Sequence, residues 1–258
     1  MRTKFVAGNW KMNLSLEQAR TLASELVNMY ANESQQTIPV MLAVPAPYLS
    51  EISRLVKHNP MFRVSSQNIH QEEKGAFTGE ISCEMVLSCG GNSTLIGHSE
   101  RRQYFGETNE LLAKKIDRAL SSGLTPVYCL GETLPERESG NTLQVVGSQL
   151  EGGTFHLDSV SFEKILVAYE PVWAIGTGKT ATPAQAQEVH AFIRRKISEK
   201  YGKEVADKTL ILYGGSVTAA NAAELFSQED IDGGLVGGAS LKSREFMNII
   251  LSAESVAK

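Results

Sequence analysis

Four residues that could carry acid–base chemistry stand just after short apolar runs of the sequence: Asn9, Lys11, His98 and Glu170. Glutamate and histidine are common general acids and bases, whereas an ammonium or an amide stabilises negative charge that develops on oxygen. In an extended segment, the i, i+2 spacing of Asn9 and Lys11 directs both side chains the same way, so they could flank one ligand. These residue types together supply an acid, a base and a cation.

Taken singly, each of these side chains also fits an ordinary structural role. Lys11 resembles a solvated surface lysine, and His98 resembles a buried, hydrogen-bonded core histidine. His98 and Ser99 do not form a nucleophile elbow, because Arg101 stands where the G-x-S-x-G pattern requires glycine. The histidines of the chain are scattered without the spacing of metal ligands, so no metal site is expected.

Glu170 is followed by a loop of unusual composition. Pro171 keeps Glu170 out of the helical region and fixes its own φ, so the backbone sets the direction of the carboxylate. Residues 172–175 are too apolar for an ordinary solvated loop, and Gly176 can adopt positive φ. From these residues alone, a lid over a site and a loop packed statically on the domain are both open. A nucleotide-binding P-loop is excluded, because Trp173 stands where that pattern requires glycine.

Two glycine pairs indicate where an anion could bind. Gly214 and Gly215 precede Ser216, and Gly237 and Gly238 open a segment that could begin a short helix. Glycine lets backbone amides approach an anion closely, and the N-terminus of a helix favours phosphate. Either pair alone could be a tight turn, but two such pairs in successive loops favour a phosphate site.

The composition narrows the class of protein. The 258 residues, of which 42% are hydrophobic and 21% charged, suffice for one α/β barrel or two small domains. A formal net charge of -4 argues against nucleic acid as a partner but leaves room for a local cationic pocket. The three cysteines include no C-x-x-C pair, which suits a reducing compartment. With no apolar run typical of a signal peptide or a membrane span, we expect a cytoplasmic protein without a membrane partner.

Apolar strand-like runs alternate with amphipathic helix-like segments along the chain, which predicts parallel strands with helical crossovers. One helix is predicted to begin at Pro183, within a capping box formed by Thr182 and Gln185. The predicted strands are 5–7, 40–44, 62–64, 94–96, 125–129, 165–169, 210–213 and 234–236. About eight strands close a (β/α)8 barrel, so we predict an α/β fold with a single domain over residues 1–258. The residues after the strands would then gather at one face, where barrel enzymes place their chemistry.

The motifs at these predicted strand ends closely resemble those of the triosephosphate isomerase family. They are Asn9-Trp10-Lys11-Met12-Asn13, Gly97-His98-Ser99-Glu100-Arg101-Arg102, Ala168 to Lys179, Tyr213-Gly214-Gly215-Ser216-Val217 and Leu235 to Leu241. The match is specific, covers nearly the whole chain in order and includes Gly75 to Glu80 and Cys129 to Thr133. Departures are small: Leu14 stands where glycine is frequent, and Ala46 lies between two prolines.

The resemblance implies a TIM barrel that interconverts dihydroxyacetone phosphate and glyceraldehyde 3-phosphate through an enediolate, without a cofactor. Glu170 would move the proton between adjacent carbons, and His98 would be a neutral imidazole that polarises the carbonyl. Lys11 and Asn9 would stabilise the oxyanion, and Lys11 would also balance the phosphate charge. Glu100 would support these groups from beside the site rather than carry a proton.

The resemblance also assigns the phosphate-binding groups and a partner. The amides of Gly176, Gly237 and Gly238 and the hydroxyl of Ser216 would hold phosphate, while residues 172–179 close over it as a lid. Ser99 would lie beside the site as a supporting residue.

The long segment from Gln67 to Glu80 is implied to dock into a second copy of the chain. Its tip, 76–79, is oddly exposed for a monomer, and Arg101 and Glu80 could pair across the homodimer. From the residues alone, a loop folded on its own chain is the alternative.

Two other functions compete with the isomerase. A Schiff-base aldolase would need a desolvated lysine at a strand end, for which Lys11 is the obvious candidate. A catalytically silent barrel would bind phosphate compounds without turning them over.

Overall fold

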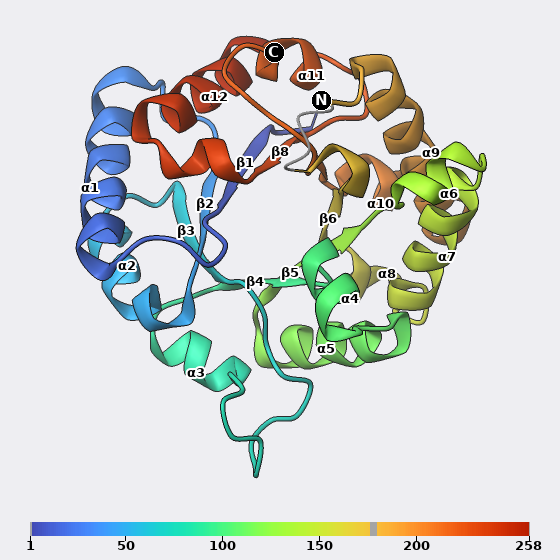
Figure 1. Cartoon of the computed structure of the whole chain (residues 1–258), viewed down its shortest axis with the longest axis horizontal. Coiled ribbons are helices and arrows are strands. Elements are labelled where there is room, and N and C mark those ends of the chain that lie inside the picture. The colour runs from blue at the N-terminus through green and yellow to red at the C-terminus, as the bar shows by residue number, and fades with distance from the viewer. Residues whose placement is uncertain (1, 176–179, 258) are drawn as a thin grey trace.

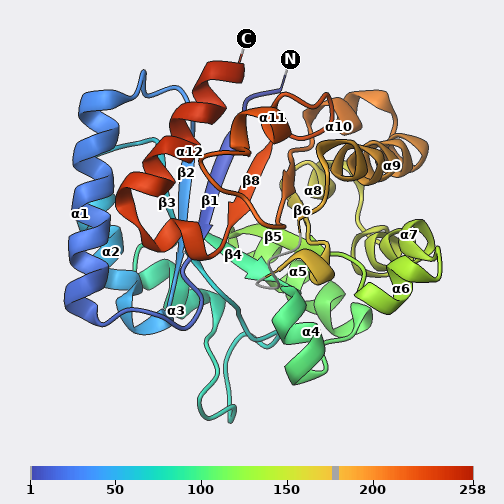
Figure 2. The same cartoon turned by 45° about the horizontal axis from the view of Figure 1, so that its top comes forward.

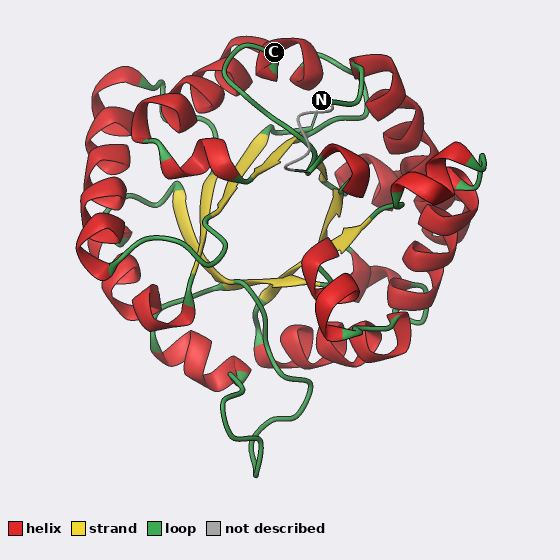
Figure 3. Cartoon of the chain, in the orientation of Figure 1, coloured by secondary structure: helices red, strands yellow, loops and turns green. Residues whose placement is uncertain are grey.

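The computed structural model describes residues 2–175 and 180–257, and its strands form one closed parallel barrel (Figures 1 and 3). Each strand pairs with the next one along the chain, and β8 pairs with β1 to close the barrel. The (β/α)8 barrel predicted from the sequence is confirmed, and every strand lies where an apolar run predicted it. The strands are β1 (Phe5–Asn9), β2 (Val40–Val44), β3 (Phe62–Ser66), β4 (Ser93–Ile96), β5 (Thr125–Leu130), β6 (Leu166–Tyr169), β7 (Ile211–Tyr213) and β8 (Gly233–Val236).

Helices surround the barrel as an outer ring, drawn in red around the yellow strands in Figure 3. The α-helices are α1 (Leu16–Glu33), α2 (Leu49–Val56), α3 (Cys83–Ser88), α4 (Ser99–Phe105), α5 (Asn109–Ser122), α6 (Leu134–Glu138), α7 (Thr142–Thr154), α8 (Ser159–Phe162), α9 (Pro183–Tyr201), α10 (Lys203–Lys208), α11 (Ala222–Phe226) and α12 (Ser243–Val256). The short 3-10 helices are η1 (Ala46–Tyr48), η2 (Val172–Ala174) and η3 (Gly238–Leu241).

Local sequence explains where these helices begin and end. The Thr182 hydroxyl accepts the Gln185 N–H and the Gln185 side chain accepts the Thr182 N–H, so α9 begins at Pro183, as predicted. At its C-terminus, α5 ends at Ser122 and is capped by Gly123, which takes the left-handed conformation with φ 86.

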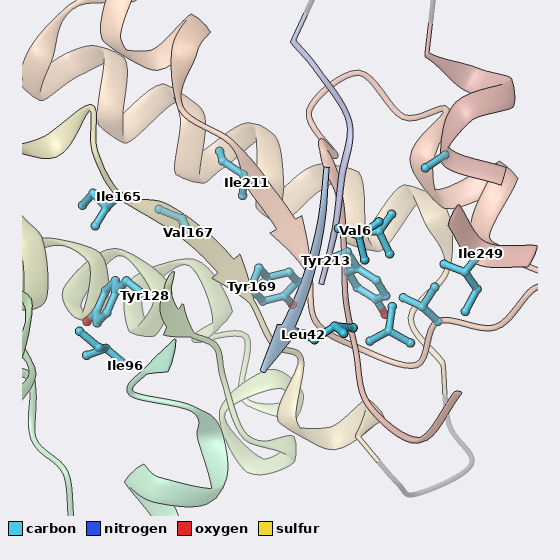
Figure 4. Packing of buried hydrophobic residues seen from close by; sticks show 14 of the residues in the cluster. Val6, Leu42, Ile96, Tyr128, Ile165, Val167, Tyr169, Ile211, Tyr213 and Ile249 are labelled. Atoms are coloured by element: carbon cyan, nitrogen blue, oxygen red, sulfur yellow. The ribbon is translucent and has the colours of Figure 1, made fainter. Parts of the chain in front are cut away.

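Nearly all strand residues are buried, because one face of the sheet lines the barrel interior and the other packs on the helices. This double burial explains why the strands appear in the sequence as continuous apolar runs. Figure 4 shows members of the outer layer, including Val6, Leu42, Val167, Tyr169 and Ile211. The barrel interior holds Phe5, Ala7, Met41, Ala43, Leu95, Val127, Cys129, Leu166, Ala168, Leu212 and Leu235.

The connection between β3 and α3 projects away from the barrel in both Figure 1 and Figure 2. It contains the segment 67–80, whose Phe77 side chain is 42% exposed. Across residues 2–175 and 180–257, none of the helices has the length and apolar character needed to cross a membrane.

Candidate active site

A cavity of about 470 Å³ lies where the carboxyl ends of the strands meet. The structure brings together there residues from the loops after β1, β4, β6, β7 and β8. Among the residues that line it are Asn9, Lys11, His98, Glu170, Ser216, Gly237 and Gly238. Groups separated by more than two hundred positions in the chain therefore face one small volume.

Glu170 is buried at the end of β6, and both of its carboxylate oxygens are held. Its Oε1 lies 3.0 Å from His98 Nε2, and its Oε2 accepts a hydrogen bond of 2.9 Å from the Ser99 N–H. Burial alone would raise the pKa of this carboxyl. The adjacent His98 ring, the Ser99 N–H and the Lys11 ammonium outweigh that effect and hold the pKa of Glu170 below its ordinary value. Glu170 is thus an ionised carboxylate at neutral pH, as a base must be.

His98 caps the N-terminus of α4, which fixes the orientation of its ring. Its Nδ1 accepts the backbone N–H of Glu100 at 3.4 Å, so the proton of the neutral ring lies on Nε2, facing Glu170. Burial opposes the imidazolium, but Glu170 and Glu100 outweigh it and raise the pKa of His98 above its ordinary value. The resemblance implied a neutral imidazole. In this arrangement the Glu170 carboxylate favours the imidazolium, while the hydrogen bond to Nδ1 favours the neutral ring.

Lys11 reaches the same cavity by a route that the sequence did not predict. The expectation of an extended segment from Asn9 to Lys11 is wrong, because β1 ends at Asn9 and Lys11 has φ 51, in the left-handed region. A lysine held there is strained, and such strain clusters at functional sites. The Asn9 carboxamide accepts the Lys11 N–H at 3.0 Å and supports this turn. The ammonium then lies 2.6 Å from Glu100 Oε1.

Both glycine pairs line the same cavity, but they have different structural reasons. A Cβ on Gly214 would lie 2.8 Å from Glu170 Cγ, and one on Gly215 would lie 2.3 Å from the Tyr213 hydroxyl. This first pair therefore makes room for the neighbouring side chains. Gly237 and Gly238 are open toward the cavity, since a Cβ on Gly238 would meet no atom within 4 Å.

The sequence as a whole matches a family model described as triosephosphate isomerase, over residues 4–253. The chain belongs to the triosephosphate isomerase family. It is 50% identical to the triosephosphate isomerase of Cytophaga hutchinsonii over 252 residues, covering 98% of this chain and all of that protein. It is also 52% identical to the triosephosphate isomerase of Bacteroides fragilis over 250 residues, covering 97% of this chain and 98% of that one.

The start of the segment 172–179, which was predicted to be a lid, contacts a carboxylate to which the sequence analysis gave no role. Glu132 is fully buried and accepts hydrogen bonds from the Tyr169 hydroxyl and, at 2.8 Å, from Trp173 Nε1. The Arg137 guanidinium lies 3.4 Å from the same carboxylate. The available signal was its place in the family motif that runs from Cys129 to Thr133. The predicted phosphate ligand Gly176 lies outside the described residues.

Glu100 and Ser99 both contact the central groups of this triosephosphate isomerase site. One carboxylate oxygen of Glu100 forms an ion pair with the Lys11 ammonium, and the other lies 3.5 Å from His98 Nδ1. Ser99 acts through its backbone N–H, which holds Glu170. In the part of the chain that the structure describes, no group of three or more histidine, cysteine or acidic residues is arranged to hold a metal ion.

Proposed function

We propose that this chain interconverts dihydroxyacetone phosphate and D-glyceraldehyde 3-phosphate by moving one proton between adjacent carbons through an enediolate. The observation that carries the proposal is the 3.0 Å approach of the Glu170 carboxylate to His98 Nε2, inside a cavity that also holds Lys11 and the glycine loops. Membership of the triosephosphate isomerase family supports the substrate and the reaction.

Glu170 is the base that removes the proton from one carbon and returns it to the next. Its pKa lies below the ordinary value, so the base is present in its active form at neutral pH. It is also buried, which keeps water from the proton in transit. A positioned general base contributes on the order of 10²- to 10⁴-fold to the rate.

His98 and Lys11 act on the oxygen atoms of the substrate. Nε2 of His98 lies 3.0 Å from Glu170 Oε1, which leaves no room for an atom between them. When the carboxylate turns toward the substrate carbon, this N–H becomes free to donate to the carbonyl oxygen and then to exchange a proton with the neighbouring oxygen of the enediolate. The Lys11 ammonium and the Asn9 carboxamide add fixed positive charge and a donor for the developing oxyanion. Because these groups are already oriented, little reorganisation accompanies the reaction.

The phosphate of the substrate binds at the glycine loops that line the same cavity. Ser216 and the amides of Gly237 and Gly238 hold it, and Gly176 adds a donor from the lid. Binding a group that does not react supplies energy for closing the lid and excluding water, which protects the enediolate from losing phosphate.

The remaining features of the proposal concern the protein as a whole. We propose that the chain forms one domain, needs neither cofactor nor metal, and functions in the cytoplasm. It forms a homodimer through the segment Gln67 to Glu80. The Arg101 and Glu80 pairing expected between subunits competes with a bond inside the chain, because Arg101 Nε donates to Glu107 Oε1 at 2.6 Å.

A coupled assay tests the function directly. Purified protein is supplied with D-glyceraldehyde 3-phosphate, and glycerol-3-phosphate dehydrogenase with NADH reports dihydroxyacetone phosphate. The chain should turn over substrate, whereas Glu170→Gln should lose most turnover yet still bind phosphoglycolate. Binding without turnover by the unmodified chain would identify a silent barrel, and a lysine adduct trapped with borohydride would identify an aldolase.

A further inference from the structure

Arg102 forms hydrogen bonds to the ends of two barrel strands beside the site, although it does not line the cavity. Its Nε donates to the Gly97 carbonyl at 3.0 Å, and its Nη2 donates to the Cys129 carbonyl at 3.0 Å. Gly97 follows β4 and Cys129 lies in β5. One planar guanidinium therefore bridges the carboxyl ends of neighbouring strands, and its fork geometry fixes their separation.

The guanidinium is itself held by Tyr128. Arg102 Nη2 donates to the Tyr128 hydroxyl at 3.0 Å, and that hydroxyl donates to the Gln149 carbonyl at 2.6 Å. Gly153 accommodates this contact, since a Cβ there would lie 2.1 Å from the Tyr128 oxygen. The chain thus keeps a glycine within α7 to make room for the tyrosine hydroxyl.

Gln149 extends these contacts to Gly131, which follows β5 and packs against Glu170 at the end of β6. Its side-chain amide pairs with both backbone groups of Gly131: Oε1 accepts the N–H at 2.7 Å and Nε2 donates to the carbonyl at 3.1 Å. Gly131 packs directly on the backbone of Glu170, because a Cβ there would lie 1.8 Å from the Glu170 carbonyl oxygen. The Glu170 N–H also donates to the Leu130 carbonyl at 2.7 Å.

The two ends of this network are the backbone positions of the two acid–base groups. Arg102 holds the carbonyl of Gly97, the residue before His98, and Gln149 holds Gly131, against which Glu170 rests. Gly97 has φ 75, a left-handed turn that favours glycine, and the bond from Arg102 holds its carbonyl at the point where His98 leaves the strand. The network spans β4, β5 and β6 behind the reacting groups.

We propose that Arg102, Tyr128 and Gln149 form a positioning clamp that sets the distance between His98 and Glu170. The clamp rests on the proposed function, since it acts on the residues assigned to proton transfer there. It contacts the backbone of Gly97 and Gly131, which neighbour those residues, and none of its three members lines the cavity. An error of about 1 Å at reacting groups costs roughly a hundredfold in rate, so a clamp of this kind affects turnover more than binding.

Two variants and a matched control test the clamp. Tyr128→Phe removes the hydroxyl that links Arg102 to Gln149 and leaves the ring. Arg102→Lys keeps the charge but loses the fork. Tyr201→Phe is the control, because the Tyr201 hydroxyl also lies on backbone carbonyls, those of Thr154 and Leu157, away from the strand ends.

The clamp predicts a loss in kcat with KM nearly unchanged. We expect kcat to fall about tenfold in Tyr128→Phe and about a hundredfold in Arg102→Lys, the scale of a small misplacement of reacting groups. In both variants KM and phosphoglycolate binding should stay within about twofold, because the phosphate side is untouched. Tyr201→Phe should keep kcat within about twofold even where its melting temperature falls as far as that of Tyr128→Phe.

The imidazole ¹⁵N signals of His98 give a second readout that does not depend on turnover. They should shift in Tyr128→Phe and stay in place in Tyr201→Phe. The clamp is refuted if both tyrosine variants lose kcat equally, or if Tyr128→Phe raises KM alone and leaves the His98 signals unmoved. A wild-type chain without isomerase activity would instead refute the proposed function, and the imidazole signals would still decide the clamp.

Discussion

At the residue scale, Glu170 and His98 determine each other's protonation. Burial works against a charge on His98, yet the carboxylate 3.0 Å away outweighs it and raises the pKa of the ring. Replacing Glu170 with glutamine removes that charge and keeps the burial, so the pKa of His98 should fall below that in the wild type. An NMR titration of the imidazole signals measures it. Glu100→Gln, at a carboxylate 3.5 Å away and 41% exposed, should lower the pKa of His98 by less; equal values in all three proteins would contradict this coupling.

A second residue-scale prediction concerns His190, on α9. Its ring is fully buried against Tyr169 and Tyr213, and burial lowers its pKa to about 3. In the unfolded chain the pKa of histidine is about 6.5, so between these values only the unfolded state takes up the proton. The free energy of unfolding should therefore decrease as pH falls through this window, by up to about 1.4 kcal/mol per pH unit.

Replacing His190 with a residue that does not titrate should weaken the decrease of the free energy of unfolding at low pH. Urea unfolding of His190→Phe and of the wild type, at pH 7 and pH 5, gives the difference. We expect the wild type to lose more stability than His190→Phe between the two pH values. His156→Gln removes a partly exposed histidine as the control. A wild-type loss equal to that of His190→Phe would show that the folded protein binds a proton on His190 as readily as the unfolded chain does, so that burial does not lower this pKa.

At the element scale, the turn after β4 sets the direction in which the His98 side chain points. Gly97 has φ 75, and a Cβ there would lie 2.7 Å from Leu112 Cδ1 and 3.2 Å from the Cys129 carbonyl. Gly97→Ala should therefore lower the free energy of unfolding by more than the 1–2 kcal/mol that a left-handed alanine costs, and roughly 1–3 kcal/mol of overpacking adds to it. It should also reduce kcat, since the turn carries His98.

The chain offers a matched control for this substitution. Gly140 has φ 74, nearly the same as Gly97, but a Cβ there would meet no atom within 4 Å. Gly140→Ala should show the conformational cost alone, with unchanged kcat. Denaturant unfolding and steady-state kinetics of both variants separate strain from steric conflict. Equal losses of stability at the two positions would mean that the turn after β4 relaxes around the added methyl group.

The strands and the face that carries the site could be predicted from sequence, because burial on both faces of a parallel sheet leaves continuous apolar runs. The conformation of Lys11 could not be predicted, since a left-handed lysine has no local sequence signature. Leu14 also has positive φ, 73, a conformation that favours glycine over leucine. The contacts of Glu132 and Arg102 join groups on or just after the consecutive strands β4, β5 and β6, so they emerge only when these strands pair.

At the scale of the whole molecule, the exposed apolar side chains indicate where a second copy would bind. Phe77 packs against His70 in a tilted arrangement with ring centroids 4.2 Å apart, at the projecting segment, and remains 42% exposed. Met12 is 95% exposed, and Tyr104 and Phe105 are exposed nearby. A cavity of about 560 Å³ borders all of these elements, and its lining includes Met12, Gly79, Glu80, Tyr104 and Phe105.

That second cavity also connects the proposed dimer to the active site. Lys11 and His98 line both cavities. A second copy bound over the second cavity would therefore cover part of each of these side chains. Covering the second cavity would exclude water from Lys11 and add contacts to the strained turn in which this residue lies. Loss of the dimer should therefore reduce turnover, even though all the proposed catalytic groups belong to one chain.

Phe77→Ser tests this connection. It removes the largest apolar group at the tip of the projecting segment, so we expect monomers at micromolar concentration and kcat lower by about a hundredfold, the scale of a misplaced catalytic group. Val160→Ser, at an exposed apolar position on α8, should stay dimeric and active. Sedimentation equilibrium and kinetics at several protein concentrations measure both effects. Because dissociation is reversible, activity of the Phe77→Ser protein should rise with concentration; full activity in a demonstrated monomer would separate catalysis from assembly.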